Sequence, residues 1–243
     1  MKYGVLVLIL SFIQFTYAQN KKDWGYKDSG APQYWANINP LYLGCTEGNQ
    51  QSPINIITKN VNKGAAHFEL KYSVAKGVNL ILSHNTFKMV YPQGNFLEMN
   101  GNRYQLKEIY FKTPGENAID SLRGMLEAQL LHEDSKGNKV ILAVFFVEGR
   151  SNPIIDMLVK NLPTQPDKAN FIANVDVHQL LPSDLASYQF DGSLTMPPCS
   201  QSVRWIVLKQ TMTITQSQVD SMRDITGVNS RPTQEIFNRL IVK

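Results

Sequence analysis

The most reactive side chains of this chain belong to two cysteines and four histidines. The cysteines, Cys45 and Cys199, stand far apart in the sequence. In an oxidising compartment a lone pair of cysteines tends to form a disulfide, and closing so long a loop would stabilise the fold by somewhat under about 5 kcal/mol. Two buried free thiols are the alternative interpretation.

The histidines do not form a metal-binding pattern. They are scattered over the chain as His67, His84, His132 and His178. Because a zinc site needs three or four ligands at one point, this distribution gives little support to a zinc enzyme built from them.

Short β-strands are the elements that must position any site. Runs of β-forming residues separated by turn residues predict strands at 80–82, 86–91, 103–113, 125–132 and 139–148. A meandering, mainly antiparallel sheet follows from this order.

Two helices interrupt the strand pattern. Asn152 as N-cap and Pro153 in the first turn begin one helix, which Pro163 ends. Thr215 caps the second helix, and Gly227 ends it.

The amino terminus has the pattern of an export signal. Lys2 precedes a nearly continuous apolar run at 4–15, and small residues at Thr16 and Ala18 precede the expected cleavage site. The alternative, a membrane anchor, needs roughly 20 apolar residues. We therefore expect a signal peptide at 1–18, a secreted or periplasmic protein, and no membrane insertion after cleavage.

Composition indicates one domain that does not bind nucleic acid. The 243 residues are 43% hydrophobic and can bury one sizeable core, and no linker divides 19–243. The net charge of +4 is small, and the basic residues are dispersed rather than clustered in a stripe.

Several short segments, in a characteristic order and spacing, carry a family resemblance. They are Trp24-Gly25-Tyr26, Tyr34-Trp35, Gln51-Ser52-Pro53-Ile54-Asn55-Ile56, Tyr104-Gln105-Leu106, Asp191-Gly192-Ser193-Leu194-Thr195-Met196-Pro197-Pro198-Cys199, Trp205-Ile206-Val207 and Asn229-Ser230-Arg231-Pro232. This pattern resembles the alpha-class carbonic anhydrases over nearly all of the mature chain. The resemblance implies a mostly β fold, with a large twisted, mainly antiparallel central sheet, short peripheral helices and a conical pocket.

Enzymes of that class hold zinc with three histidines, and the zinc lowers the pKa of a bound water to about 7. Two ligands lie one residue apart on a strand and therefore on one face, and the third lies on the neighbouring strand. The corresponding residues here are Tyr110, Lys112 and Gln129, none of which is an ordinary zinc ligand at neutral pH. The resemblance thus implies that no zinc is bound and that the chain has no catalytic residues.

Other pocket positions of the family are partly retained. Thr195 and Glu116 match the pair that orients zinc-bound hydroxide, and we expect both to remain as local hydrogen-bonding groups. Glu127 matches the carboxylate that holds the third ligand. His132 matches a histidine that is not a ligand, and a buried structural role is expected for it.

The cone wall and the proton-shuttle position follow from the same match. The apolar wall against which carbon dioxide would rest corresponds to Leu131, Ile141, Leu194 and Trp205, and Met196 stands beside Thr195. Asn85 occupies the shuttle position, and His84 precedes it by one residue. On a strand that step would turn the imidazole to the opposite face.

Lys112 has two expected roles. Its ammonium could balance carboxylates left without zinc, namely Glu127 and Glu108, because a buried unpaired charge costs several kcal/mol. Alternatively, its side chain could extend toward the mouth of the cone and keep the ammonium in water.

Three functions from different classes compete. The first is an exported carbonic anhydrase-like protein without catalytic activity, which binds an unknown small molecule or protein or has a structural role. The second is a residual or metal-independent carbonic anhydrase or esterase that uses Lys112, Tyr110 or His132. The third is a zinc enzyme with ligands elsewhere in the chain.

The metal content of the purified mature protein tests the lost-ligand interpretation. We expect well under one equivalent of zinc, and no rise in melting temperature when zinc is added, because a ligand that binds the native state must stabilise it. Elemental analysis and thermal unfolding check this expectation. Stoichiometric zinc that survives dialysis would contradict it.

Overall fold

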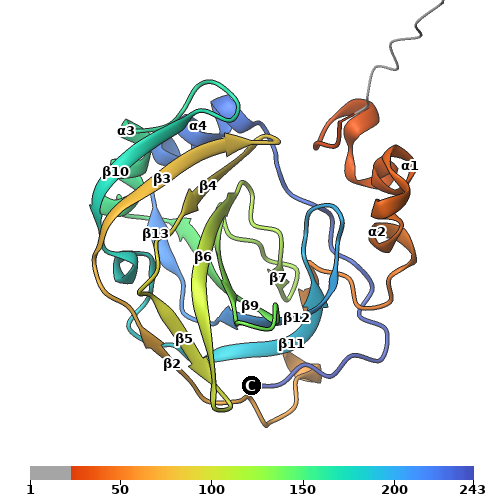
Figure 1. The fold of residues 1–243 in the computed structure, drawn as a ribbon. Coiled ribbons are helices and arrows are strands. Elements are labelled where there is room, and N and C mark those ends of the chain that lie inside the picture. Colours follow the sequence, from red (N-terminus) through yellow and green to blue (C-terminus); the bar gives the residue numbers. More distant parts are fainter. Residues whose placement is uncertain (1–22) are drawn as a thin grey trace, which may run out of the picture.

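One large β-sheet organises residues 23–243, the part of the chain that the computed structural model describes (Figure 1). Eight of its 11 strands follow the order β10-β3-β4-β6-β8-β9-β12-β11; β13 pairs with β9, and β5 joins β2 to β6. The bounds are β2 (Phe68–Lys71), β3 (Ala75–Ser83), β4 (Thr86–Val90), β5 (Phe96–Met99), β6 (Asn102–Lys112), β8 (Leu126–Glu133), β9 (Lys139–Glu148), β10 (Ala169–Val175), β11 (Ser187–Ser193), β12 (Gln201–Leu208) and β13 (Met212–Ile214). Two short strands, β1 (Asn55–Ile56) and β7 (Ala118–Ile119), form a separate pair.

The predicted fold class is confirmed. Within the large sheet all pairings are antiparallel except those of β9 with β12 and β13. Each of the five strand runs predicted from the sequence overlaps one of the observed strands β3, β4, β6, β8 and β9.

Both faces of the central strands are covered. β8 is buried along almost its whole length, because its alternate side chains enter two different apolar clusters. The larger cluster lies on the back face, where α3 (Pro153–Lys160) and α4 (Gln216–Thr226) pack against the sheet. The predicted helix starts are confirmed: the side chains of Asn152 and Thr215 accept hydrogen bonds from the first turns.

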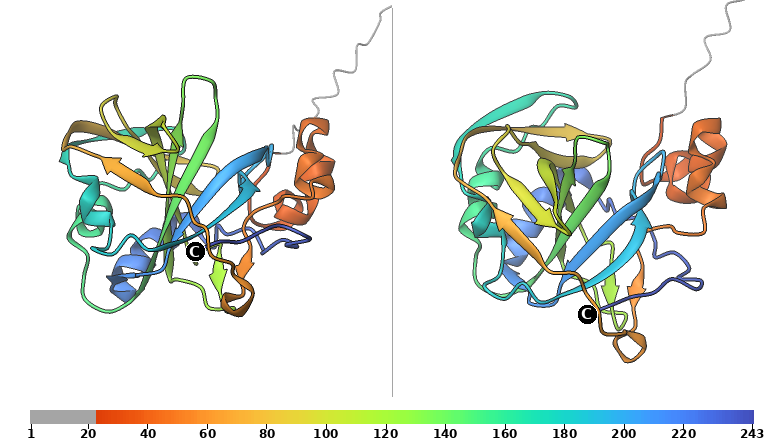
Figure 2. Two further views of the ribbon diagram at one scale, coloured as in Figure 1. Left: turned by 90° about the horizontal axis from the view of Figure 1, so that it is seen from below. Right: turned by 60° about the horizontal axis from the view of Figure 1, so that its bottom comes forward.

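The N-terminal segment, defined here as residues 23–48, lies at one side of the molecule (Figure 2), where residues 23–30 line one pocket together with Thr226 of α4. It contains the short helices α1 (Trp35–Ile38) and α2 (Gly44–Glu47) and three 3-10 turns, at Asp28–Gly30, Pro32–Tyr34 and Pro40–Tyr42. A small aromatic cluster around Trp35 holds the segment together. Two further 3-10 turns lie at Thr58–Asn60 and Val177–Leu180.

Cys45 and Cys199 form a disulfide that spans 154 residues, so the expectation of a bond is confirmed and the free-thiol alternative is wrong. The bond ties the N-terminal segment to the loop after β11.

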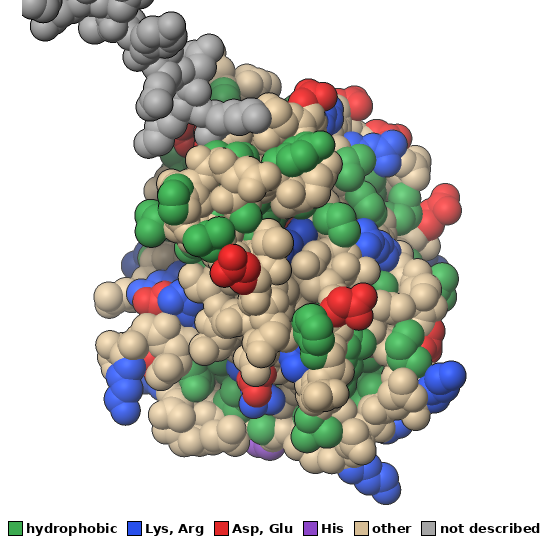
Figure 3. Space-filling view, turned by 90° about the vertical axis from the view of Figure 1, so that its right-hand side faces the viewer, with side chains coloured by type: hydrophobic (Ala, Val, Ile, Leu, Met, Phe, Trp, Pro, Cys, Tyr) green, Lys and Arg blue, Asp and Glu red, His purple; other side chains and the backbone are tan. Residues whose placement is uncertain are grey.

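The predicted signal peptide at 1–18 lies outside the described residues. Within 23–243 no helix is both long and apolar enough to cross a bilayer. On the face shown in Figure 3, basic and acidic side chains are intermixed.

His132 lies behind the sheet, away from the pocket. It is an odd number of residues from Gln129 on β8, so the two side chains point to opposite faces. The imidazole is fully buried, and its Nε2 lies 2.6 Å from the Tyr72 hydroxyl. Nδ1 has no hydrogen-bond partner within the described part of the chain. The expected structural role of His132 therefore agrees with its position.

His132 predicts an acid-sensitive stability. Burial lowers its pKa from 6.5 to about 4. Between pH 6.5 and 4, His132 therefore binds a proton in the unfolded chain but stays neutral in the folded protein. About 3 kcal/mol of the free energy of unfolding is lost as the pH falls through this range. We expect the unfolding free energy of His132→Gln to fall less steeply over this range in denaturant titrations. His67→Gln, at an exposed position, is the control and should keep the parental slope; equal slopes for all three proteins would contradict the prediction.

The disulfide predicts a second stability effect. Changing both Cys45 and Cys199 to serine should cost about 2–5 kcal/mol, because the unfolded chain gains freedom. Hydrogen exchange should rise most in the loop at 194–200. The parent protein with and without reductant provides the matched comparison. Two titratable thiols in protein recovered from an oxidising compartment would refute the prediction.

Candidate functional site

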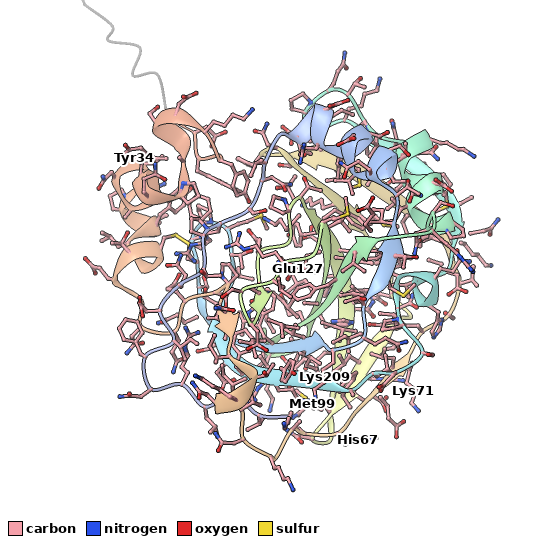
Figure 4. All side chains as sticks on the ribbon, turned by 180° about the vertical axis from the view of Figure 1, so that it is seen from behind. Tyr34, His67, Lys71, Met99, Glu127 and Lys209 are labelled. Carbon is pink, nitrogen blue, oxygen red and sulfur yellow. A yellow bond between two sulfur atoms is a disulfide. The ribbon has the colours of Figure 1, made fainter. Side chains whose placement is uncertain are left out.

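The three lost-ligand positions converge on the front face of the sheet. Tyr110 and Lys112 lie two residues apart on β6, so their side chains share a face. Gln129 of β8 stands directly opposite Tyr110, and Glu127 stands opposite Lys112. The geometry expected from the spacing is therefore present, although the side chains are different. Figure 4 labels Glu127 and shows it in the interior of the molecule.

Lys112 is the centre of this site. Its side chain is 0% exposed, and its ammonium lies 2.7 Å from the Tyr26 hydroxyl, 3.3 Å from Glu116 Oε1 and 3.5 Å from the Asn229 carbonyl oxygen. An ammonium has three N–H donors, so these three acceptors satisfy it. Burial alone would lower the pKa of Lys112, but the attraction of Glu116 and Tyr26 outweighs burial, and the pKa lies above its ordinary value.

The charge-balancing role expected of Lys112 is present but with a different partner, and the alternative role is wrong. The ammonium pairs with Glu116, which follows β6 in a loop, and not with Glu127 or Glu108. It does not extend to water either, because no part of the side chain is exposed. The reason is local: Glu127 is already satisfied by neutral donors.

Glu127 accepts four hydrogen bonds. The backbone N–H groups of Glu116 and Asn117 donate to Oε2 at 2.6 and 2.9 Å. The side chains of Asn117 and Gln129 donate to Oε1 at 2.8 and 3.1 Å. Burial and the charge of Glu116 raise the pKa of Glu127, and these hydrogen bonds limit the rise. Glu127 thus holds the side chain at the third ligand position, as its family match predicts.

Gln129 bridges the two buried carboxylates. Its amide nitrogen donates to Glu116 Oε2 at 2.9 Å as well as to Glu127. Both amide protons are used, so this nitrogen faces the carboxylates.

Sequence reasoning assigned no role to Arg231, although it belongs to one of the family segments. Its side chain is buried, and its guanidinium donates to the Cys45 and Ser52 carbonyl oxygens at 2.6 and 2.7 Å and to Gln51 Oε1 at 2.9 Å. Its backbone N–H donates to Glu116 Oε1 at 2.9 Å. Burial lowers its pKa to about 10. The role of Tyr26 as a partner of Lys112 was missed as well.

Tyr110 belongs to a second polar group, nearer the mouth of the pocket. Its hydroxyl donates to Glu108 Oε2, and Lys88 Nζ lies 2.8 Å from Glu108 Oε1. Burial and the negative charge of Glu108 raise the pKa of Tyr110. The cation near Glu108 is therefore Lys88 of β4 and not Lys112.

Thr195 and Glu116 were both expected to remain local hydrogen-bonding groups, and Glu116 does so. The Thr195 side chain is buried, and no hydrogen bond joins it to Glu116 among residues 23–243. Glu116 instead accepts from Gln129, Arg231 and Lys112. Two residues that precede β1 fix the loop that carries Thr195. Gln51 donates to the Cys199 carbonyl oxygen, and the Ser52 N–H donates to Ser193 Oγ.

His84 and Asn85 form a turn rather than part of a strand, which corrects the expectation. They join β3 to β4, and both have positive φ, at 47° and 58°, as in a two-residue hairpin turn. The His84 ring stacks on Trp24 with centroids 4.3 Å apart. Asn85 is exposed, and its carbonyl oxygen accepts from Asn229.

The expected apolar wall is present. Leu131, Ile141 and Trp205 belong to one buried cluster on the front face, and Leu194 and Tyr110 pack against it. Met196 is half-buried in the loop beside Thr195.

The zinc ion that enzymes of the family use does not fit these side chains. The Lys112 ammonium has no lone pair for a metal, and the Tyr110 hydroxyl and the Gln129 amide nitrogen are donors to carboxylates. Within the described residues, no group of three His, Cys, Asp or Glu side chains could hold a metal ion elsewhere. We therefore derive no metal-dependent step for this pocket.

The arrangement closes the pocket floor. Lys112, Glu116, Glu127 and Gln129 are each at most 2% exposed, so a ligand cannot reach them without a change in structure.

Comparisons with known proteins agree with this geometry. The family model for eukaryotic-type carbonic anhydrases matches residues 30–243. A carbonic anhydrase of Neisseria gonorrhoeae is 32% identical over 241 residues, covering 98% of this chain and 95% of that protein. Dioscorin DB3L of Dioscorea polystachya is 30% identical, with 97% of this chain and 92% of that protein covered.

Structural similarity gives the same assignment. The alpha-carbonic anhydrase of Thermovibrio ammonificans, solved with the inhibitor sulfanilamide, has a TM-score of 0.87 and 32% identity, covering 91% of this chain and 99% of that one. Sequence and fold agree over nearly the whole described part, and the chain belongs to the eukaryotic-type carbonic anhydrase family.

Proposed function

We propose that this chain is an exported carbonic anhydrase-like protein that binds a small molecule or a protein partner and does not hydrate carbon dioxide. The observation that carries the proposal is the buried ammonium of Lys112, ion-paired with Glu116 where the zinc mechanism needs an imidazole. The absence of a bound zinc cofactor is part of this proposal.

The competing proposal is a residual or metal-independent hydratase or esterase. A general base must be unprotonated near neutral pH and must lie within reach of its substrate. The pKa of Lys112 is raised, and its side chain is fully buried. The pKa of Tyr110 is also raised, by burial and by the negative charge of Glu108. His132 lies on the opposite face of the sheet. These positions favour the acatalytic proposal.

Because the floor is buried, a ligand would meet the partly exposed groups of the front face. There the exposed fractions of the Lys88 and Glu108 side chains are 26% and 22%, and Leu194 and Met196 are half-buried. A mixed surface of charge and apolar groups suits a small polar molecule or a protein loop.

Two independent features of the chain support export. The first 18 residues have the pattern of a signal peptide, and disulfides such as Cys45–Cys199 are typical of oxidising compartments. Both support a secreted or periplasmic protein.

A hydration assay tests the proposed function. We expect mature protein, dialysed against chelator and then supplied with zinc, to leave the rate of carbon dioxide hydration at the uncatalysed level. A carbonic anhydrase with three zinc-binding histidines, measured alongside, is the positive control. Protein-dependent hydration, with or without zinc, would refute the proposal.

Rebuilding the ligand set is the sharper prediction. In Tyr110→His/Lys112→His/Gln129→His, Glu116 loses its cation, so the zinc-free variant should melt below the parent. Zinc should then bind and raise the melting temperature, since three imidazoles leave one open tetrahedral position. Hydration should appear but stay slow, because Asn85 supplies no imidazole shuttle and the larger, apolar Met196 stands beside Thr195.

Each single reversion serves as a control for the triple variant. One histidine alone should bind little zinc, because coordination by one or two imidazoles is too weak. A folded triple variant without zinc would show that Glu127 and Thr195 no longer support a metal site.

A further inference from the structure

Lys112 joins two parts of the molecule that lie far apart in sequence. Glu116 belongs to the pocket floor, whereas Tyr26 belongs to the N-terminal segment. The same ammonium contacts both and also lies 5.0 Å from the centre of the Tyr26 ring. Trp24 extends this contact by stacking on the His84 turn.

Other contacts hold the N-terminal segment along its length: His84 lies 3.3 Å from Asp23, and the Arg231 guanidinium lies 5.6 Å from the centre of the Trp35 ring. The Cys45–Cys199 disulfide and the hydrogen bond from Arg231 to the Cys45 carbonyl oxygen both hold α2. At Tyr26 the contact is made by the ammonium of Lys112, whose side chain is 0% exposed. Lys112 therefore links this end of the segment directly to the buried polar cluster.

The charges under the segment balance. Four charged side chains are buried together around Glu116: Lys112, Arg231, Glu116 and Glu127. Two are cations and two are carboxylates, so the cluster is formally neutral. Removing one partner of a buried pair leaves an uncompensated charge, which is strongly destabilising.

We infer that Lys112 is a built-in cation that neutralises the pocket floor and fastens the N-terminal segment across it through Tyr26. The inference concerns the pocket of the proposed function and rests on that proposal in taking the floor to be free of metal. It makes the segment a fixed cover over the floor, so any ligand meets the outer cone and the cover together.

Chemical rescue tests the inference. Lys112→Ala removes the three methylenes and the ammonium that propylammonium can restore, and it should increase the equilibrium constant of unfolding at least about 100-fold. Propylammonium should then raise the melting temperature with concentration, because it binds only the folded cavity. Propan-1-ol, of similar size but neutral, should not.

A matched lysine provides the control. Lys139 of β9 pairs with Glu133 at 3.2 Å, but both side chains are about one-third exposed. Lys139→Ala should change the unfolding constant less than about 10-fold and should show no rescue by propylammonium. Equal rescue of both variants, or equal effects of propylammonium and propan-1-ol, would overturn the inference.

Tyr26→Phe is a second, milder test that applies even if Lys112→Ala does not fold. This variant removes one hydroxyl and leaves the Lys112–Glu116 pair in place. Amide hydrogen exchange should accelerate at 23–34, while exchange in β6 and β8 stays at the parental rate. Unchanged exchange at 23–34 would overturn the fastening role. Carbon dioxide hydration by the parent would refute the proposed function alone, since none of these measurements depends on activity.

Discussion

The pocket of this protein depends on one buried ion pair, between Lys112 and Glu116. Removing two charges from water costs several kcal/mol each, and only close pairing with further hydrogen bonds offsets that cost. Here each donor of the ammonium has an acceptor, and Glu116 receives additional N–H donors from Gln129 and Arg231. The polar arrangement of the floor follows from satisfying this pair.

The same constraint explains how the scaffold tolerates its unusual ligand positions. The larger apolar core lies behind the sheet, between β6, β8 and the helices α3 and α4, and takes no part in the pocket. The front face therefore could change its polar side chains while the back face kept the strands in register. What the front face required was charge balance, which Lys112 and Arg231 supply against Glu116 and Glu127.

Family membership by itself does not assign the function of this chain. The alpha-type fold is shared with enzymes that carry the name carbonic anhydrase, whereas function belongs to the side chains at the site. At this site the ion pair of Lys112 and Glu116 stands where the zinc-binding side chains of those enzymes stand.

By itself the sequence determined the fold class, the disulfide partners, both helix caps and the strand face shared by Tyr110 and Lys112. These features follow from local chemistry: the two-residue period of a strand, the hydrogen-bonding side chain of a cap, and a single pair of cysteines. Only the tertiary structure decided which carboxylate meets Lys112, because Glu116 reaches the ammonium from a loop. It also decided that Glu116 accepts from Gln129, Arg231 and Lys112 and that His84 and Asn85 form a turn. In each case the outcome depends on competition among neighbouring donors and acceptors brought together from distant segments, which no local pattern records.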